Sequence, residues 1–380
     1  MAKLLWLNWS GGGNLPPSLG IARALTERGH SVAFAGRPEM VARVKDAGFR
    51  AIELAQSYAQ VDRYPASPVT RMSCYLTSPA VGEEIRATIE AELPDAILID
   101  AMFPAALEAA SEYDVPSAVF FHHFFFRLQE QWRGTGARLN AMREQAGFAP
   151  LPALEELWKR HDRIIVTTLA QFDEPADSQW TSVYHVGPVL EDEKCAAPAT
   201  LPWDVNDPTP LILVSFSTAP EQRSFEKLQR GLDALADLPV HVVATTAGVV
   251  DPQELSIPQN AVALEWAAHD PILRQASLLI THGGHGTLMR SLTHGVPAIV
   301  IPGLAHDQAP NGAMLQEWGA GIALPGDADA AAIRSAAQTI LSTPSYKETA
   351  ARLSLLLTDV DGACAAADHI ELLEVGGCHA

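Results

Sequence analysis

Short apolar runs alternate with stretches of helical spacing along this chain, and the alternation occurs twice. In the first half, the apolar run at residues 4–9 ends in a glycine break, and residues 17–28 then place Ile21, Ala22 and Leu25 on one helix face. Alternating strands and crossover helices build parallel sheets. The first half is therefore predicted to be an α/β domain, with further strands at residues 31–35, 96–99, 117–121 and 163–167.

The alternation stops near residue 188 and restarts at residue 211, where a second α/β domain is predicted to begin. The stretch between them is rich in proline, alanine and acidic residues and has no apolar periodicity, which is typical of a linker. Two domains also fit the 380 residues of the chain. The predicted parts are an N-terminal domain (1–192), a linker (193–210), a C-terminal domain (211–357), and a helix and tail (358–380) that packs back on the N-terminal domain.

Acidic residues outnumber basic ones, 45 against 26, and give a formal charge of −19. Such a field repels nucleic acids and anionic membranes, so we expect neither as a partner. No apolar run reaches the length of about 18 residues that spans a bilayer, and the N-terminus lacks a signal-cleavage pattern, which favours a cytoplasmic protein. The cysteines at positions 74, 195, 364 and 378 form no CxxC pair, so reduced thiols are expected. A homodimer stays an open alternative.

The strand-like run at residues 278–281 passes through a glycine-rich turn into a helix. Glycines let a ligand approach the backbone closely, and the unpaired amides of a first helical turn attract anionic groups. Thr287 adds a hydroxyl there, and His282 can donate from its ring to a phosphate oxygen. The segment favours a phosphate site, although glycines alone are equally typical of a tight strand-to-helix turn.

Three motifs of the second half carry a specific resemblance: THGGHGT at residues 281–287, HGVPAIVIP at 294–302 and HDQ at 306–308. They resemble the nucleotide-sugar signature of family 1 glycosyltransferases, and the likeness covers nearly the whole chain, most closely to bacterial enzymes that place deoxysugars on polyketides. The resemblance implies two Rossmann-like domains that face each other across a cleft, the GT-B fold. It also implies a nucleoside-diphosphate sugar as co-substrate, a small-molecule acceptor, and neither a metal nor another cofactor.

Carried over by position, the family pattern implies a donor site in the C-terminal domain. The glycine loop and the LVSFST loop would hold the diphosphate, and the HDQ motif would bind the sugar hydroxyls. The segment LEWAAHD would contact the nucleobase. Trp266 in core packing and Asp307 as a helix N-cap are the alternatives. The implied donor-binding residues are Ser217, Thr218, Trp266, Ala267, His282, Gly284, Gly286, Thr287, Asp307 and Gln308.

Arg290 stands where many relatives carry a glutamate that bonds the ribose hydroxyls. This departure argues against UDP-glucose. A deoxyribose nucleotide lacks one of those hydroxyls, so we expect a dTDP-sugar.

An inverting transfer needs a base within reach of the acceptor hydroxyl. The family supplies a histidine in the first loop, steadied by an aspartate. Here Asn14 stands at the histidine position, and asparagine cannot act as a base, whereas Asp100 matches the aspartate. His122, His123 or Asp100 itself is expected to take the proton; a helix cap for Asp100 and core packing for the histidines are the alternatives. The implied catalytic residues are Asp100, His122 and Asn14.

Aromatic side chains follow the strand at residues 117–121, where an apolar acceptor would bind. We therefore expect a planar, aromatic acceptor, with core packing as the alternative role for the phenylalanines. The implied acceptor-binding residues are Trp9, Gly13, His123, Phe124 and Trp132.

Other classes of protein fit less well. An NADP-dependent oxidoreductase would use the first glycine loop and Arg37, but Pro16 stands where the third glycine of a dinucleotide fingerprint belongs. A metalloenzyme would use His282 and His285, but two glycines separate them and HEXXH is absent. A nucleotide-sugar-binding helper protein without turnover stays open because of Asn14.

Overall fold

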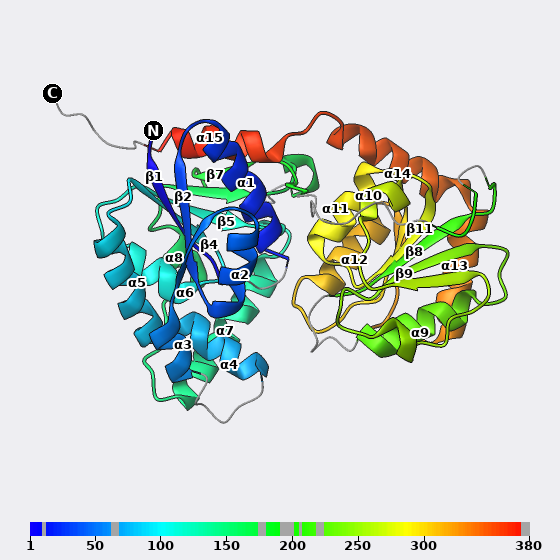
Figure 1. Ribbon diagram of the computed structural model, residues 1–380, viewed down its shortest axis with the longest axis horizontal. Coiled ribbons are helices and arrows are strands. Elements are labelled where there is room, and N and C mark those ends of the chain that lie inside the picture. Colours follow the sequence, from blue (N-terminus) through cyan, green and yellow to red (C-terminus); the bar gives the residue numbers. More distant parts are fainter. Residues whose placement is uncertain are drawn as a thin grey trace. The chain divides into compact units, whose positions relative to one another are not determined.

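The computed structural model describes residues 1–9, 13–61, 68–173, 180–190, 201–204, 207–217 and 224–373. The chain forms two compact units, the first of Met1–Glu191 with Asp361–Ala380 and the second of Asp192–Val360 (Figure 1). In the described ranges, no helix is long and apolar enough to cross a membrane. Both units have the predicted Rossmann-like arrangement of parallel strands and crossover helices, so the predicted fold class is confirmed.

The first unit contains a seven-stranded sheet in the order β3-β2-β1-β4-β5-β6-β7, with every pair parallel. Its central strands are buried on both faces, which is typical of parallel sheets covered by helices. The strands are β1 (Lys3–Leu7), β2 (Ser31–Gly36), β3 (Arg50–Glu53), β4 (Ala96–Asp100), β5 (Ser117–Phe121), β6 (Arg163–Val166) and β7 (Val183–His185).

Proline stands at one of the first two positions of five helices in this unit, because the first-turn N–H that proline lacks has no partner within a helix. In Figure 1, α1 and α5 lie on opposite sides of the sheet. The helices are α1 (Leu15–Glu27), α2 (Pro38–Asp46), α3 (Ala55–Val61), α4 (Pro68–Thr77), α5 (Pro79–Glu92), α6 (Pro104–Ala110), α7 (Gln129–Gln145) and α8 (Leu154–Trp158), with a 3-10 turn at Ala170–Phe172.

The last helix, α15 (Gly362–Glu371), packs against α1 in the core of the first unit. Arg28, at the C-terminal end of α1, forms ion pairs with Asp368 at 2.6 Å and with Glu371 at 2.8 Å. Gly362 has no room for a side chain, since a Cβ there would lie 2.5 Å from the Gly187 carbonyl oxygen. The two ends of the described chain thus belong to one core.

The second unit contains a six-stranded parallel sheet in the order β10-β9-β8-β11-β12-β13. Its core is formed by apolar residues of the central strands together with α9 and α13. The strands are β8 (Leu211–Ser215), β9 (His241–Thr245), β10 (Ala261–Leu264), β11 (Ala276–Thr281), β12 (Ala298–Val300) and β13 (Gly321–Ala323). The helices are α9 (Ser224–Leu235), α10 (His269–Leu273), α11 (His285–Thr293), α12 (Gln308–Glu317), α13 (Ala330–Ser342) and α14 (Pro344–Leu357), with a 3-10 turn at Pro252–Glu254.

Candidate functional site

Ligand-binding loops of an open parallel sheet gather where the strand order reverses, at the carboxyl ends of the strands. In the first unit this point lies between β1 and β4. Asn14 precedes α1 as its N-cap, Asp100 is the last residue of β4, and His122 follows β5 directly. The structure therefore brings the three residues that the sequence singled out for catalysis to one edge of one sheet.

Asp100 lies at the centre of this group and is only 3% exposed. Its carboxylate accepts hydrogen bonds from Asn14 Nδ2 at 2.6 Å, from Trp9 Nε1 at 3.0 Å and from the Met102 backbone N–H at 2.9 Å. His122 Nε2 lies 3.7 Å from the oxygen that Asn14 contacts. Asn14 is thus a donor to the carboxylate, in the place where the family histidine was expected.

Burial raises the pKa of Asp100 above its usual value, because the charged carboxylate loses its water. The hydrogen bonds from Asn14, Met102 and Trp9 oppose this rise, and so does the nearby His123. A carboxylate with a raised pKa holds a proton more readily near neutral pH. The site therefore contains a proton acceptor, although Asn14 cannot be one.

Two residues that the sequence reasoning missed connect Asn14 with His122. The Ser18 hydroxyl donates to the Asn14 carbonyl oxygen at 2.9 Å and lies 3.3 Å from His122 Nε2. Asn8 Nδ2 donates to Ser18 Oγ at 3.1 Å. A signal was available, because Asn8 is a polar residue at the end of an apolar strand and Ser18 lies one helical turn after Asn14.

The residues predicted to bind an acceptor are divided between the site and the core. Trp9 is half-buried with its indole on Asp100, and Gly13 is exposed. Phe124 and Trp132 are 1% and 0% exposed, and Trp132 packs edge-on against two further aromatic rings. His123 is half-buried, 6.0 Å from the Trp132 ring. Phe124 and Trp132 therefore pack in the core in this structure.

A buried carboxylate from a distant segment fixes the loop after β5. Asp173 is fully buried and accepts hydrogen bonds from the backbone N–H groups of Phe125 at 2.7 Å and Arg127 at 2.9 Å. It also pairs with His185 Nε2 at 3.0 Å. Asp173 thereby determines the path of the segment that carries His122 and the aromatic residues after it.

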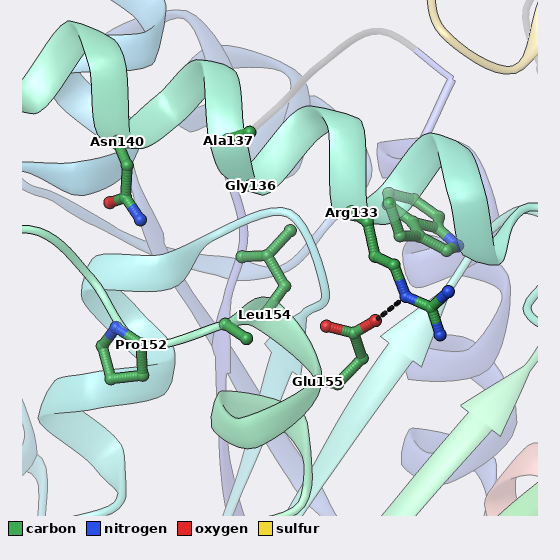
Figure 2. Close-up of a pocket in the computed structure, with 9 residues that line it drawn as sticks. Arg133, Gly136, Ala137, Asn140, Pro152, Leu154 and Glu155 are labelled. Atoms are coloured by element: carbon green, nitrogen blue, oxygen red, sulfur yellow. Dashed lines mark hydrogen bonds and ion pairs between the residues drawn. The ribbon is translucent and has the colours of Figure 1, made fainter.

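A cavity of about 230 Å³ lies between α7 and the start of α8, and Figure 2 shows the residues that line it. Arg133 and Glu155 form an ion pair of 3.2 Å in its wall, and the Asn140 side chain bonds the backbone of Leu151. Its other lining residues are small or apolar: Trp132, Gly136, Ala137, Pro152, Ala153 and Leu154. Since Trp132 contacts both His123 and this cavity, the cavity adjoins the loop after β5.

The second unit repeats the arrangement, with its strand order reversing between β8 and β11. Ser217 follows β8, His282 follows β11, and Gly284 is the N-cap of α11, while Thr218 lies outside the described residues. Among the residues described, no side chain caps α11. The N–H groups of its first turn, which includes Gly286 and Thr287, are therefore available to an anion.

Packing explains two of the three glycines in this loop. Gly283 has a φ of +89°, and a Cβ on it would lie 2.6 Å from a Val300 methyl group. A Cβ on Gly284 would lie 2.6 Å from His282 Nε2. A Cβ on Gly286 would meet nothing within 4 Å, so the missing side chain leaves open space beside the first turn.

His282 is neutral near pH 7, because burial lowers its pKa to about 4. The cation of Lys227 lowers this pKa further, and the carboxylate of Asp307 opposes both effects. Its Nδ1 lies 3.3 Å from Thr281 Oγ1. A neutral imidazole keeps one N–H to donate, which is what a phosphate oxygen requires.

The loop after β12 carries the two residues expected to bind sugar hydroxyls. Asp307 and Gln308 are 4% and 3% exposed. Gln308 Oε1 accepts from the Gly303 N–H at 2.6 Å, and Asn311 Nδ2 links Asp307 at 3.3 Å to the Gly283 carbonyl at 2.9 Å. The Asp307 side chain makes no cap hydrogen bond to α12, so the predicted N-cap role is not realised.

The segment that was expected to contact the nucleobase of the donor carries an exposed indole, that of Trp266. Trp266 is 54% exposed, with its ring 3.3 Å from where a Cβ on Gly248 would lie, so its predicted alternative of core packing is wrong. The neighbouring Ala267 is half-buried. Arg290, on α11, forms an ion pair with Asp270, whose other oxygen lies 2.8 Å from His294 Nε2.

Residues 229–357 match the family described as "Erythromycin biosynthesis protein CIII-like, C-terminal domain". The chain is 25% identical to NDP-glycosyltransferase YjiC of Bacillus licheniformis, over 94% of each chain. It is 24% identical to demethyllactenocin mycarosyltransferase of Streptomyces fradiae, over 98% of this chain and 86% of that relative.

Solved structures share the fold of the whole chain. The calicheamicin glycosyltransferase CalG4 matches with a TM-score of 0.77 and 24% identity, over 98% of each chain. The glycosyltransferase VinC, solved in complex with dTDP, matches with a TM-score of 0.73 and 18% identity, over 98% of this chain and 100% of that one.

Proposed function

We propose that this chain, which has the GT-B fold, is a glycosyltransferase of the antibiotic-biosynthesis type that transfers a deoxysugar from a dTDP-sugar to an aromatic acceptor, with inversion at the anomeric carbon. The glycosyltransferase relatives, the mycarosyltransferase among them, and the dTDP complex of VinC support the donor class. Acceptor binding is assigned to the first unit and donor binding to the second. The proposed reaction uses no metal ion, and its rate is therefore expected to be insensitive to EDTA.

The observation that carries this proposal is the loop between β11 and α11. It combines an uncapped helix N-terminus, the open space at Gly286 and the neutral ring of His282 at the carboxyl end of a central strand. Amide and imidazole N–H groups at such a point suit a diphosphate. Thr287 and Ser217 add hydroxyl groups to the same proposed site.

The preference for dTDP is supported by the ion pair of Arg290 with Asp270. A guanidinium has five donors and no acceptor, so Arg290 cannot replace a glutamate that accepts hydrogen bonds from two ribose hydroxyls. A 2′-deoxyribose has one hydroxyl fewer to satisfy. Trp266, which is exposed, is proposed to stack on the thymine.

In the proposed reaction, the acceptor hydroxyl loses its proton to the Asp100–His122 pair while its oxygen attacks the anomeric carbon. The bond from that carbon to the diphosphate oxygen breaks, and dTDP leaves with the electron pair. The two groups lie 3.7 Å apart in a buried site, within reach of the same proton. Asn14 holds the carboxylate in place through its 2.6 Å hydrogen bond.

Calorimetric titration with dTDP, UDP and NADPH tests the donor assignment. Binding of dTDP in preference to UDP is expected, and both His282→Ala and Thr287→Ala are expected to abolish it. Binding of NADPH alone would refute the proposal and move the site to the first glycine loop. Incubation with dTDP-sugars and planar phenols, followed by mass spectrometry, then tests transfer.

Asn14 also favours a second candidate, a helper protein that binds a nucleotide sugar without turning it over. Asparagine cannot replace the family histidine as a base. Tight dTDP binding without product from any acceptor, and gain of product in Asn14→His, would support this candidate. Product formation by the unaltered protein would exclude it.

A further inference from the structure

A buried lysine lies beside the candidate donor loop, and the sequence reasoning did not single it out. Lys227, in the first turns of α9, is 6% exposed. Its Nζ donates to the carbonyl oxygens of Pro302 at 2.7 Å and Ile301 at 3.3 Å. Within the part of the chain that the structure describes, no carboxylate lies within ion-pair distance of it. A buried cation without a counterion is costly and calls for an explanation.

Backbone contacts place this ammonium at the carboxyl edge of the second sheet. Ile301, whose carbonyl Lys227 contacts, donates its N–H to the Thr281 carbonyl at 2.8 Å, and His282 is the next residue. On the other side, the Ser224 hydroxyl of α9 donates to the Ser217 carbonyl at 2.9 Å. The lysine therefore lies by the strand ends that carry both Ser217 and His282.

The position of Lys227 in the first turns of α9 disfavours its charge. A cation near a helix N-terminus is unfavourable, because the helix dipole places positive charge there already. Burial, together with the nearby cation of Arg230, lowers the pKa of Lys227 to about 8, so most of the ammonium is charged at pH 7. An ammonium has three N–H donors, and among the described residues only two of them have partners. Lys227 and His282 are both donors at the carboxyl ends of these strands, and they are close enough for the charge of Lys227 to lower the pKa of His282.

We propose that Lys227 is a further donor-site residue, whose third N–H binds the diphosphate of the sugar donor. This inference rests on the proposed function. As the bond between the anomeric carbon and the diphosphate breaks, the leaving oxygen gains negative charge. A fixed ammonium in a site of low dielectric constant stabilises that charge more than it stabilises the intact donor. Lys227 thus acts on transfer as well as on binding.

Calorimetry with dTDP and thymidine separates a phosphate contact from a structural role. Lys227→Met keeps the packing of the alkyl chain and removes the charge, and it is expected to weaken dTDP binding about 10- to 100-fold while thymidine binding stays unchanged. Lys227→Arg is expected to restore most of the dTDP affinity. Arg230→Met, one turn later, removes a cation that donates to the Ala328 carbonyl at 2.8 Å and is the matched control, expected to bind dTDP as the unaltered protein does.

A pH series adds a readout that packing alone would not change. The dTDP affinity of the unaltered protein is expected to fall between about pH 7 and pH 9.5, as Lys227 loses its proton, and Lys227→Arg is expected to remove this fall. The charged and titratable groups around the ammonium are Arg230 and Glu226 on α9, with His282 and Asp307 at the strand ends.

Three outcomes would overturn the inference. If Lys227→Met binds dTDP as well as the unaltered protein does, the ammonium does not contact the diphosphate. If dTDP and thymidine lose affinity equally, with Lys227→Arg no better, the role of the lysine is structural. If the unaltered protein binds no nucleoside diphosphate, the proposed function fails as well, which distinguishes that result from the first two.

Discussion

Replacing Asn14 by alanine tests how the first-unit site is held together. The variant removes the 2.6 Å hydrogen bond to Asp100 and leaves a carboxylate that is 3% exposed with two other donors. A hydrogen bond to a charged group contributes about 1.5–3 kcal/mol, and we expect Asn14→Ala to lower the unfolding free energy of the first unit by that amount at pH 8. Urea unfolding followed by tryptophan fluorescence measures the loss.

The same reasoning predicts how this loss depends on charge. Burial raises the pKa of Asp100 in the folded state, so the stability contribution of this group is present at low pH and is lost as pH rises through the folded pKa. Asn14 supports the ionised form, so the cost of Asn14→Ala should be greatest at pH 8 and should shrink on acidification. In an Asp100→Asn background the bond is neutral, and the cost should fall to about 0.5–1.5 kcal/mol.

A double-mutant cycle of Asn14→Ala and Asp100→Asn therefore measures the coupling energy between this amide and this carboxylate. An equal cost of Asn14→Ala at both ends of the pH range, and in both backgrounds, would refute the claim that this amide acts on the carboxylate. The same variants report on activity, since a displaced carboxylate should lower kcat more than it raises KM if Asn14 positions the proton acceptor.

Three further predictions concern other parts of the chain. Gly284→Ala would displace the His282 ring and should weaken dTDP binding at least about 10-fold by calorimetry. It should also lower the Tm more than Gly286→Ala, which should leave the Tm within about 2 °C. Equal Tm losses in the two variants would contradict this contrast. Asp173→Ala leaves three donors without their acceptor and should destabilise the first unit by about 3 kcal/mol in urea; a loss below about 1 kcal/mol would show that the loop after β5 is held otherwise. Burial lowers the pKa of His161 to about 4, whereas the unfolded chain has the usual histidine pKa of 6.5. Below pH 6.5 the unfolded state therefore binds more protons, and the free energy of unfolding should fall by up to about 3 kcal/mol between pH 6.5 and about pH 4. His161→Gln should flatten that slope.

The sequence predicts the central strands well because each is a continuous apolar run. The runs at 96–99 and 117–121 became β4 and β5, buried on both faces. The edge strands β3, β7, β10 and β13 were not predicted, since three or four residues with partly exposed side chains carry little periodic signal. Their structure comes from pairing with a neighbouring strand, which no local pattern encodes.

Which site residues could be predicted from the sequence also depends on whether a local pattern marks them. Asp100 and His122 were found because they follow buried strands directly, and strand ends of a parallel sheet converge. Asp173 was missed because its partner Phe125 lies 48 residues away. For the aromatic run after β5 the sequence left two roles open, because an aromatic ring has the same sequence pattern in a core as in a binding wall; Trp132 is buried and also lines the cavity beside α7.

The contact between α15 and α1 determines the order in which the two units can be completed during synthesis. The apolar residues of α1, with Ile21 and Leu25, leave the ribosome early, but α15, which packs against α1, is made only after the whole second unit. At about 5–20 residues per second, the roughly 170 residues of Asp192–Val360 take roughly 10–30 s to translate. The second unit is continuous in sequence and can fold in that interval, whereas the growing chain keeps the α1 face uncovered and open to chaperones until α15 emerges.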